Sequence, residues 1–260
     1  MSKVKVAVHK FSSCDGCQLA FLNAGADLLL LSELVDIKHF VEAGPVDEDA
    51  EVDIAFIEGS ISTRKEQQRI EKIRQQSNYL VTIGACATSG GIQALRNFAD
   101  GQKWLSSIYA SPEYIDSLDT VSPISEYVHV DFEIWGCPVT SKQVLTVIRS
   151  LLSGVTPRDT TEKVCMECKR NNTVCTLVTK SEPCLGAVTK AGCGALCPAF
   201  GRDCFSCFGP AQDTNTSSLA NRLAGFGLSS EEVCRRYQLM NNNAPVFRNI
   251  CVRVMGQHND

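Results

Sequence analysis

The chain has 260 residues, of which 44% are hydrophobic, and a formal net charge of −4. This length is enough to bury a proper core in one large domain or two smaller ones. The acidic balance and the lack of a basic stripe argue against a nucleic-acid-binding protein, because nothing in the chain would neutralise phosphates.

No segment has the pattern of an export signal or a membrane span. Met1–Lys3 lead straight into an apolar strand pattern, without the basic segment, apolar stretch and cleavage site of an export signal. The longest apolar stretch, 19–35, is interrupted by residues such as Asp27 and Glu33, so it falls short of the roughly 18 apolar residues that cross a bilayer. We therefore expect a cytoplasmic protein with no direct membrane insertion. In that reducing compartment, closely spaced cysteines more often bind metal or do redox chemistry than form disulfides.

Strands and helices are predicted to alternate through the first half of the chain. In chain order, the patterns predict a strand over 4–8, a helix over 19–30, strands over 37–41 and 52–57, a helix after Thr63, strands over 79–83 and 127–134, and a helix after Thr140. Thr63 with Glu66, and Thr140 with Gln143, have the spacing of capping boxes. This alternation indicates an α/β fold with a doubly wound, mostly parallel sheet and helices on both faces.

Two further features complete the predicted organisation. Residues 97–125 have no clear pattern and are interpreted as an insertion that lies over the sheet edge. The stretch around Pro157 is the natural boundary, which gives one domain over 1–155 and a second over 156–260.

Four cysteines of the first domain follow predicted strands. Cys14 and Cys17 come after the first strand, Cys86 after the fourth and Cys137 after the last, each in the loop that begins there. Ligands collect at the carboxyl edge of an open parallel sheet, so these thiols can converge on one site. Four thiolates suit zinc or a 4Fe-4S cluster. A free cysteine also packs as a small hydrophobe, but four in the same position relative to a strand are poorly explained as core residues.

Eight more cysteines lie between 165 and 207 and divide by order into two sets of four. The first set is Cys165, Cys168, Cys175 and Cys184, and the second is Cys193, Cys197, Cys204 and Cys207. Paired CxxC spacings are typical of zinc sites, which are the serious alternative. Pro138 and Pro198 directly follow cysteines, as in a ferredoxin run, which favours iron. Cys234 and Cys251 belong to neither set of four and are interpreted as non-ligands.

Several motifs together resemble one family. SSCDGCQL, FIEGSI, GACATSGG and WGCP in the first half, and PCLGAVTKAGCGALCP and CFSCFGP in the second, resemble the small subunit of a nickel-iron hydrogenase. The resemblance is greatest to the soluble type exemplified by the sulfhydrogenase delta subunit, and it is weakest over 97–125 and after Gly209. It implies a flavodoxin-like doubly wound parallel sheet followed by a small, loop-rich iron-sulfur cluster domain.

The resemblance also implies the ligands of three 4Fe-4S clusters. The proximal cluster would be held by Cys14, Cys17, Cys86 and Cys137, the medial cluster by Cys193, Cys197, Cys204 and Cys207, and the distal cluster by Cys165, Cys168, Cys175 and Cys184. Cys165 stands where membrane-linked relatives use histidine. Periplasmic relatives lack the equivalent of Cys197 and carry a three-iron cluster there, so we expect four irons in this chain.

The function implied is electron relay in a hydrogenase complex. Hydrogen would react at the nickel-iron centre of a large-subunit partner, and further flavin or iron-sulfur subunits would react with NAD(P) or another acceptor. Complexes linked to heterodisulfide reductase, and flavin-based bifurcating complexes, use such a subunit as well. The small cluster-bearing subunit of respiratory complex I shares the first domain, but it has adjacent cysteines in place of the spaced Cys14 and Cys17. A zinc-stabilised scaffold with no redox role is the alternative from another class.

Glu58 lies at a strand end beside the proximal site. It is a candidate for partner contact or proton relay, and the alternative is an ordinary solvated carboxylate.

Overall fold

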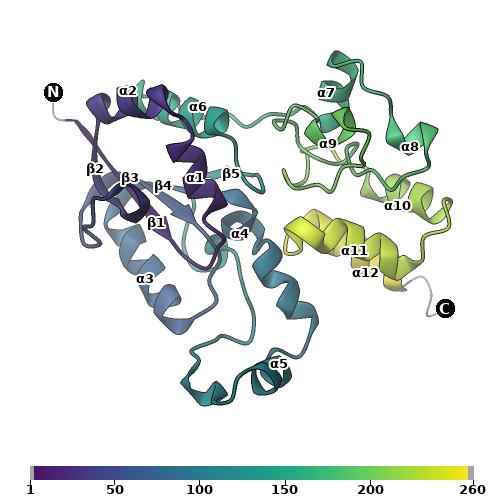
Figure 1. Cartoon of the computed structure of the whole chain (residues 1–260), viewed down its shortest axis with the longest axis horizontal. Helices are drawn as coiled ribbons and strands as arrows, with labels where there is room; N and C mark the ends of the chain where they lie inside the picture. The colour runs from purple at the N-terminus through teal and green to yellow at the C-terminus, as the bar shows by residue number, and fades with distance from the viewer. Residues whose placement is uncertain (1–2, 257–260) are drawn as a thin grey trace. The chain divides into compact units, whose positions relative to one another are not determined.

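A computed structural model describes residues 3–256 of the chain. Contacts between Cα atoms divide the chain into two compact units, Met1–Pro157 and Arg158–Asp260. The first is an α/β unit, and the second is loop-rich with short helices (Figure 1).

The first unit is built on a five-stranded parallel sheet with the order β2-β1-β3-β4-β5 (Figure 1). The strands are β1 (Val4–Lys10), β2 (Val35–Phe40), β3 (Val52–Glu58), β4 (Ser77–Ile83) and β5 (Phe132–Ile134). The helices are α1 (Gly16–Leu22), α2 (Ala26–Leu34), α3 (Arg64–Gln75), α4 (Gly84–Ser89), α5 (Gly101–Ile108) and α6 (Ser141–Leu152). The predicted α/β class and parallel sheet are confirmed, and the strand order is that of a flavodoxin-like doubly wound fold.

Alternating side chains of the strands pack into two separate hydrophobic clusters. Val8, Phe56 and Val81 face α1 and α6 on one side of the sheet. Ala55 and Leu80 belong to the cluster on the other side, together with buried residues of α3. Both predicted capping boxes are formed, at the N-termini of α3 and α6. Helices therefore cover both faces of the sheet, as the strand pattern predicts.

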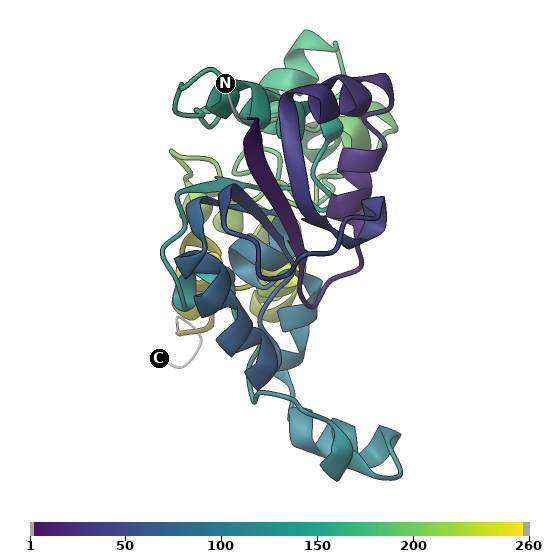
Figure 2. The ribbon, with the colours of Figure 1, turned by 90° about the vertical axis from the view of Figure 1, so that its left-hand side faces the viewer.

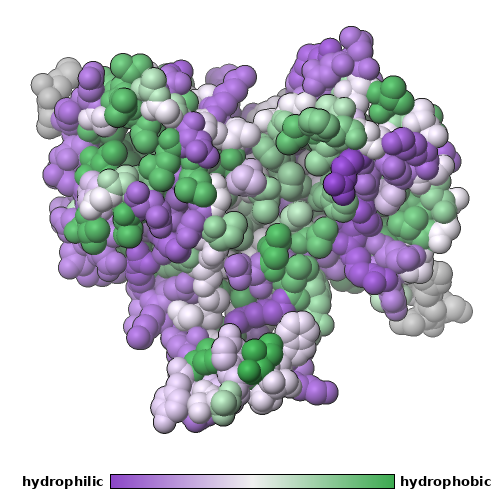
Figure 3. Space-filling model, viewed as in Figure 1, coloured by the Kyte–Doolittle hydropathy of each residue, from purple (hydrophilic) through white to green (hydrophobic). Residues whose placement is uncertain are grey.

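The prediction of one helix over 19–30 is wrong, because the chain bends between two short helices. α1 ends at Leu22, and Gly25 adopts a positive φ of 57° before α2 begins. Leu29, Leu30 and Leu34 of α2 are exposed, at 70%, 59% and 60% of their surface, and hydrophobic side chains gather on the surface over this helix (Figure 3). Within residues 3–256, α1 and α2 meet the length and apolarity needed for a bilayer span only if they are joined across their 83° bend, and no single helix does.

The predicted strand over 127–134 is much shorter in the structure. Only Phe132–Ile134 form strand pairs with β4. The Asp131 backbone N–H still donates to the Leu80 carbonyl at 3.0 Å, but the acceptor on the other side is the Asp131 carboxylate and not a backbone carbonyl. It accepts hydrogen bonds from the Leu80 backbone N–H at 2.7 Å and from the Arg74 guanidinium at 2.6 Å. The side-chain acceptor ends the ladder at this point.

The insertion does not lie over the sheet edge. Its helix α5 and the turns that follow project away from the sheet in both views (Figures 1 and 2). Ser122 returns the chain to the sheet by pairing with Ile61. The side chains of Trp104, Ile108 and Tyr114 are exposed, whereas the end of the insertion joins the core through the buried Ile124.

Two buried histidines stack on each other in neighbouring strands. The ring centroids of His9 in β1 and His39 in β2 lie 4.6 Å apart at an interplanar angle of 21°. Their exposed fractions are 4% and 0%. His9 Nδ1 and both ring nitrogens of His39 have no hydrogen-bond partner among the described residues. Burial lowers the pKa of His9 to about 3 and also lowers the pKa of His39, so both imidazoles are neutral in the folded chain.

The second unit has a loop-rich part and a helical part. The helices are α7 (Val164–Arg170), α8 (Thr176–Thr179), α9 (Leu196–Ala199), α10 (Thr216–Ala224), α11 (Ser230–Asn241) and α12 (Pro245–Gly256). α11 packs against α12, where Tyr237 and Phe247 bury their rings 5.4 Å apart. In the loop-rich part, the small core around Val164 and Ala195 consists largely of cysteines. Thiols therefore occupy positions that aliphatic side chains usually fill in a hydrophobic core.

Candidate metal centres

Four cysteines of the first unit meet beyond the carboxyl ends of the strands, and we call them the first cysteine group. Cys14 lies in the turn after β1 and Cys17 lies in α1, while Cys86 lies in α4 and Cys137 follows β5. Burial is the main cause that raises the pKa of Cys86 to about 12, and the neighbouring Cys137 and Cys14 raise it further. The pKa of Cys17 is raised by burial first, then by Glu58, Cys86 and Cys137. The fold thus brings the four thiols together. The expectation that each stays in a loop is wrong for Cys17 and Cys86, which lie in short helices.

Two of the proposed ligands pack directly against the backbone of glycines, where a side chain would collide with them. An ideal Cβ on Gly84 would lie 2.3 Å from Cys17 Sγ, and one on Gly91 would lie 2.7 Å from Cys86 Sγ. Both glycines also have positive φ angles, 86° and 56°, which strain L side chains. The backbone therefore approaches the thiols closely, as a bulky inorganic group with hydrogen-bonded sulfurs requires.

Glu58 is buried at the same edge of the sheet, with an exposed fraction of 2%. Its Oε1 accepts the Cys17 backbone N–H at 2.9 Å, and its Oε2 accepts the Gln18 side-chain amide at 2.8 Å. Burial raises the pKa of this carboxyl, and the two hydrogen bonds oppose that rise. The alternative of a solvated carboxylate is therefore wrong. Glu58 fixes the backbone of a proposed ligand instead.

We expect the variant Glu58→Gln to retain the metal of the first cysteine group. Gln is isosteric with Glu, so its oxygen can still accept the Cys17 N–H. The Oε1 of Gln18 has no partner among the described residues, so a flip of that amide gives it a bond to the new NH₂ group. Iron per chain in the purified complex measures this outcome, and loss of about four irons would contradict it. Unchanged hydrogen turnover in the same variant would end the idea that Glu58 relays protons.

The second cysteine group, Cys165, Cys168, Cys175 and Cys184, gathers around α7. Cys165 and Cys168 lie on that helix, Cys175 precedes α8, and Cys184 lies in a loop. Burial raises the pKa of Cys165 to about 11, and Cys184, Cys168 and Cys175 raise it further, in that order. An ideal Cβ on Gly186 would lie 3.6 Å from both Cys165 Sγ and Cys184 Sγ. The structure therefore brings this predicted set together.

The third cysteine group, Cys193, Cys197, Cys204 and Cys207, is brought together less completely. The pKa of Cys204 is raised mainly by burial and then by Cys184 and Cys207. The pKa of Cys193 is raised mainly by burial and also by Glu167, while Cys197 is exposed in α9. The Cys204 backbone N–H donates to Cys184 Sγ at 3.3 Å, so the second and third groups are in direct contact.

The arrangement of the thiols bears on the choice between zinc and iron. Within residues 3–256, no three Cys, His, Asp or Glu side chains lie close enough to hold one metal ion. A structural zinc site needs four ligands about 2.3 Å or less from a single ion. In a 4Fe-4S cluster, the four cysteines surround a larger body that contains several irons. The two kinds of site therefore differ in how far apart the four thiols must lie.

Two charged side chains that the sequence analysis did not single out join the ligand loops of the second unit. Arg236 of α11 donates to the carbonyl of Pro183 at 2.9 Å and forms an ion pair with Asp203. Its guanidinium lies 4.1 Å from the centre of the Phe205 ring. Pro183 precedes Cys184, and Asp203 and Phe205 flank Cys204, so one cation holds two ligand loops.

Glu167, the second of these side chains, joins α7 to the loop around Cys193 through three backbone N–H groups. No local sequence pattern identifies either contact, since the partners lie between 25 and 53 residues apart in the chain. The one available signal is that Glu167 stands between Cys165 and Cys168.

The remaining cysteines and the main cavity of the insertion lie apart from these groups. Cys234 and Cys251 are buried between α11 and α12, and each thiol donates to the backbone carbonyl of the other, at 3.7 and 3.8 Å.

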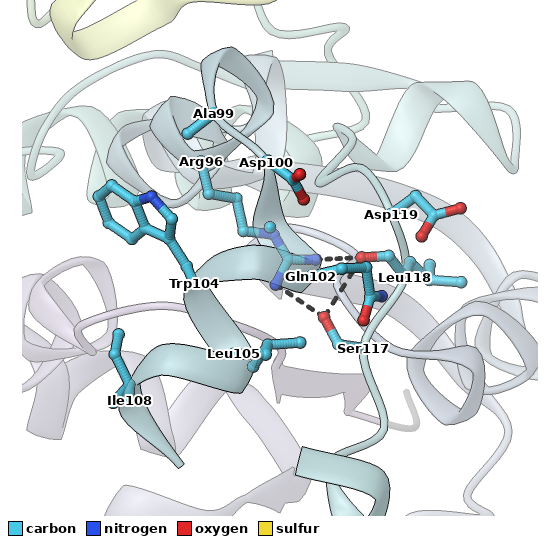
Figure 4. A pocket seen from close by; sticks show the side chains of 11 residues that line it. Arg96, Ala99, Asp100, Gln102, Trp104, Leu105, Ile108, Ser117, Leu118 and Asp119 are labelled. Carbon is cyan, nitrogen blue, oxygen red and sulfur yellow. Dashed lines mark hydrogen bonds between the residues drawn. The ribbon is translucent and has the colours of Figure 1, made fainter.

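A cavity of about 400 Å³ lies beside α5, where Arg96 donates to Ser117 and to the Leu118 carbonyl (Figure 4). The residues that line it include no cysteine, so it is not part of the candidate metal centres.

Comparison with known proteins adds an independent finding. Residues 14–151 match the model of a family described as NADH ubiquinone oxidoreductase, 20 Kd subunit. The chain is 33% identical over 233 residues to the Sulfhydrogenase 2 subunit delta of Pyrococcus furiosus, covering 90% of this chain and 97% of the relative. It is 31% identical to a vhu subunit of the F420-non-reducing hydrogenase of Methanocaldococcus jannaschii, covering 92% and 93%. A chain of a crystal structure of an NAD+-reducing NiFe-hydrogenase in the H2-reduced state is 28% identical, with a TM-score of 0.55, covering 60% of this chain and 95% of that one.

Proposed function

This chain belongs to the family of the 20 Kd subunit of NADH ubiquinone oxidoreductase and, within it, to the hydrogenase small subunits, and from this membership we propose that it is the electron-transfer subunit of a nickel-iron hydrogenase. It would hold three 4Fe-4S clusters between the nickel-iron centre of a large-subunit partner and an acceptor subunit. The observation that carries this proposal is the convergence of four thiols from three different strand ends. Packing of an ordinary apolar core does not require four cysteines to meet in this way.

The residues present fit such clusters. The first cysteine group would hold the proximal cluster, the third the medial cluster and the second the distal cluster. When bound, the clusters supply one-electron transfer between the two partners, in the order proximal, medial, distal. The residues of this chain hold and insulate them. Glu58 accepts the backbone N–H of Cys17, Gly84 and Gly91 let Cys17 and Cys86 pack against the backbone, and the Cys204 N–H donates to Cys184 Sγ.

The identity of the acceptor is the finer part of the proposal. We propose a flavin or iron-sulfur subunit that reacts with NAD(P), in a cytoplasmic complex, because the structural relative that is 28% identical is NAD+-reducing. The relative from an F420-non-reducing hydrogenase supports the second candidate, a complex linked to heterodisulfide reductase or to flavin-based bifurcation. Those acceptors differ in the partner subunits that co-purify.

Metal analysis separates the proposal from the zinc-stabilised scaffold. We would measure iron, zinc and acid-labile sulfide per chain in the anaerobically purified complex, and identify the co-purifying subunits. We expect about twelve irons with matching sulfide, and a partner that contains nickel. About three zincs without sulfide would leave a scaffold protein and end the electron-transfer proposal.

A further inference from the structure

Glu167 belongs to the helix of one cysteine group, but its carboxylate binds the loop of another. It lies on α7 between Cys165 and Cys168 of the second cysteine group. Its Oε1 accepts the backbone N–H groups of Gly192 at 2.9 Å and Gly194 at 3.1 Å, and its Oε2 accepts that of Ala195 at 3.1 Å. These three amides surround Cys193, the first member of the third cysteine group.

The backbone of this loop has a shape that needs an acceptor. Gly192, Gly194 and Ala195 all have positive φ angles, 134°, 69° and 56°. Successive backbone N–H groups in a turn that mixes right- and left-handed residues can point to one side of the chain and form a concave site for an anion. This conformation is costly at Ala195, since its Cβ is crowded in the left-handed region. The carboxylate of Glu167 fills the concave site and stabilises the loop.

The same carboxylate lies close to the sulfur of a proposed ligand. Glu167 Oε2 is 3.8 Å from Cys193 Sγ, within the range of a hydrogen bond from a thiol. Negative charge near a cluster sulfur favours the oxidised, less negative form of the cluster. Glu167 therefore affects both the position and the electronic environment of Cys193.

We propose that Glu167 is a positioning residue that fixes the Cys193 loop on the helix of the second cysteine group and lowers the reduction potential of the cluster bound by the third group. The inference rests on the proposed function for the presence of that cluster. It gives a role to a carboxylate of α7 that lies beside a proposed ligand of the neighbouring group. In electron relay, the side chain sets the relative ease of reduction of two adjacent centres.

The test compares Glu167→Gln with Glu162→Gln in the anaerobically purified complex. In E167Q, the amide oxygen can keep the bonds to Gly192 and Gly194, while the amide NH₂ faces Cys193 Sγ as a new donor. Glu162 is the matched control: it lies just before α7 and its carboxylate is bound by Arg170 at 2.9 and 2.6 Å, so E162Q removes the same charge without touching the loop. Potentiometric titration followed by electron paramagnetic resonance measures the potential of each cluster.

We expect E167Q to shift one cluster potential upward, and E162Q to leave all of them at the wild-type values. Iron in the wild-type complex with unchanged potentials in E167Q would overturn the role of Glu167 and leave the proposed function intact. Wild-type protein with zinc and no sulfide would overturn both. These results distinguish the two failures.

A second measurement does not depend on the clusters surviving substitution. Hydrogen exchange of the full chain reports the amides of residues 192, 194 and 195 directly. We expect exchange about tenfold or more faster at these three amides in Glu167→Ala, since charge-assisted hydrogen bonds protect them, and no change there in Glu162→Ala. Equal exchange rates in E167A and the wild type would refute the proposal that Glu167 fixes the Cys193 loop.

Discussion

Replacing Gly84 with alanine is expected to remove the cluster of the first cysteine group, with a loss of about four irons per chain. The new Cβ would lie 2.3 Å from Cys17 Sγ and 3.5 Å from its Cβ, at a φ of 86°. Two non-bonded atoms cannot approach so closely, so Cys17 must leave its position. Iron and sulfide per chain, together with the spectrum of the remaining clusters, measure the loss.

Gly154→Ala is the control that isolates the clash from the strain of the backbone. Gly154 also has a positive φ, 69°, but nothing lies within 4 Å of its added Cβ. This variant therefore bears the same kind of conformational cost, about 1–2 kcal/mol, without any contact with a thiol. Full iron content in G84A, or equal loss of iron in both variants, would show that space beside Cys17 does not matter.

Acid is expected to destabilise the sheet of the first unit steeply, because of the buried pair His9 and His39. The pKa of each histidine is lower in the folded chain than the usual value of 6.5. Below pH 6.5 the unfolded chain therefore binds protons that the folded chain does not, so stability is present above that pH and is lost as pH falls. His9, whose folded pKa is about 3, contributes about 1.4 kcal/mol per pH unit once the unfolded chain is fully protonated, and the lowered pKa of His39 adds to this slope.

Native-state hydrogen exchange of the β1 and β2 amides between pH 6.5 and 5, corrected for intrinsic exchange, measures this slope in the full chain. His39→Leu removes one of the two groups, and both nitrogens it removes lack a partner among the described residues, so we expect the slope to fall by up to half. His129 is the control, because its side chain is 81% exposed, and we expect H129Q to keep the wild-type slope. An unchanged slope in H39L would exclude the stacked pair as the cause.

The parts of the fold that depend on local pattern could be predicted from the sequence. The apolar run Val52–Ile57 lies within a central strand because it is buried on both faces. Thr63 and Glu66 begin a helix because they satisfy two backbone N–H groups reciprocally. In both cases the controlling interactions lie within a few residues of each other.

The errors arose where distant contacts or repeated apolar residues decided the outcome. The run of leucines from Leu28 to Leu31 permits several helical registers, and only Leu31 is buried. The periodicity therefore could not reveal the bend at Gly25. The strand before Phe132 was predicted too long because the Asp131 carboxylate bonds a residue 51 positions away, which no neighbouring residue indicates.

The candidate site shows the same division between local and distant information. The spacing of the cysteines and their positions after strands identify the ligand candidates, because cysteines are rare and their order divides them into sets. The side chains that hold the ligand loops could not be found in this way. Arg236 and Glu167 are ordinary surface residue types in sequence, and their roles depend on where α11 and α7 lie.

The bond from the Cys204 N–H to Cys184 Sγ has a consequence for biogenesis. Because Arg236 also holds the residues beside both cysteines, the two ligand loops of the second unit order one another. If the chain binds the proposed clusters, a chain that has received one of the two clusters of this unit already has part of the binding site for the other. We therefore expect insertion of these two clusters to be cooperative, and insertion at the first cysteine group, built on the parallel sheet, to be independent of them.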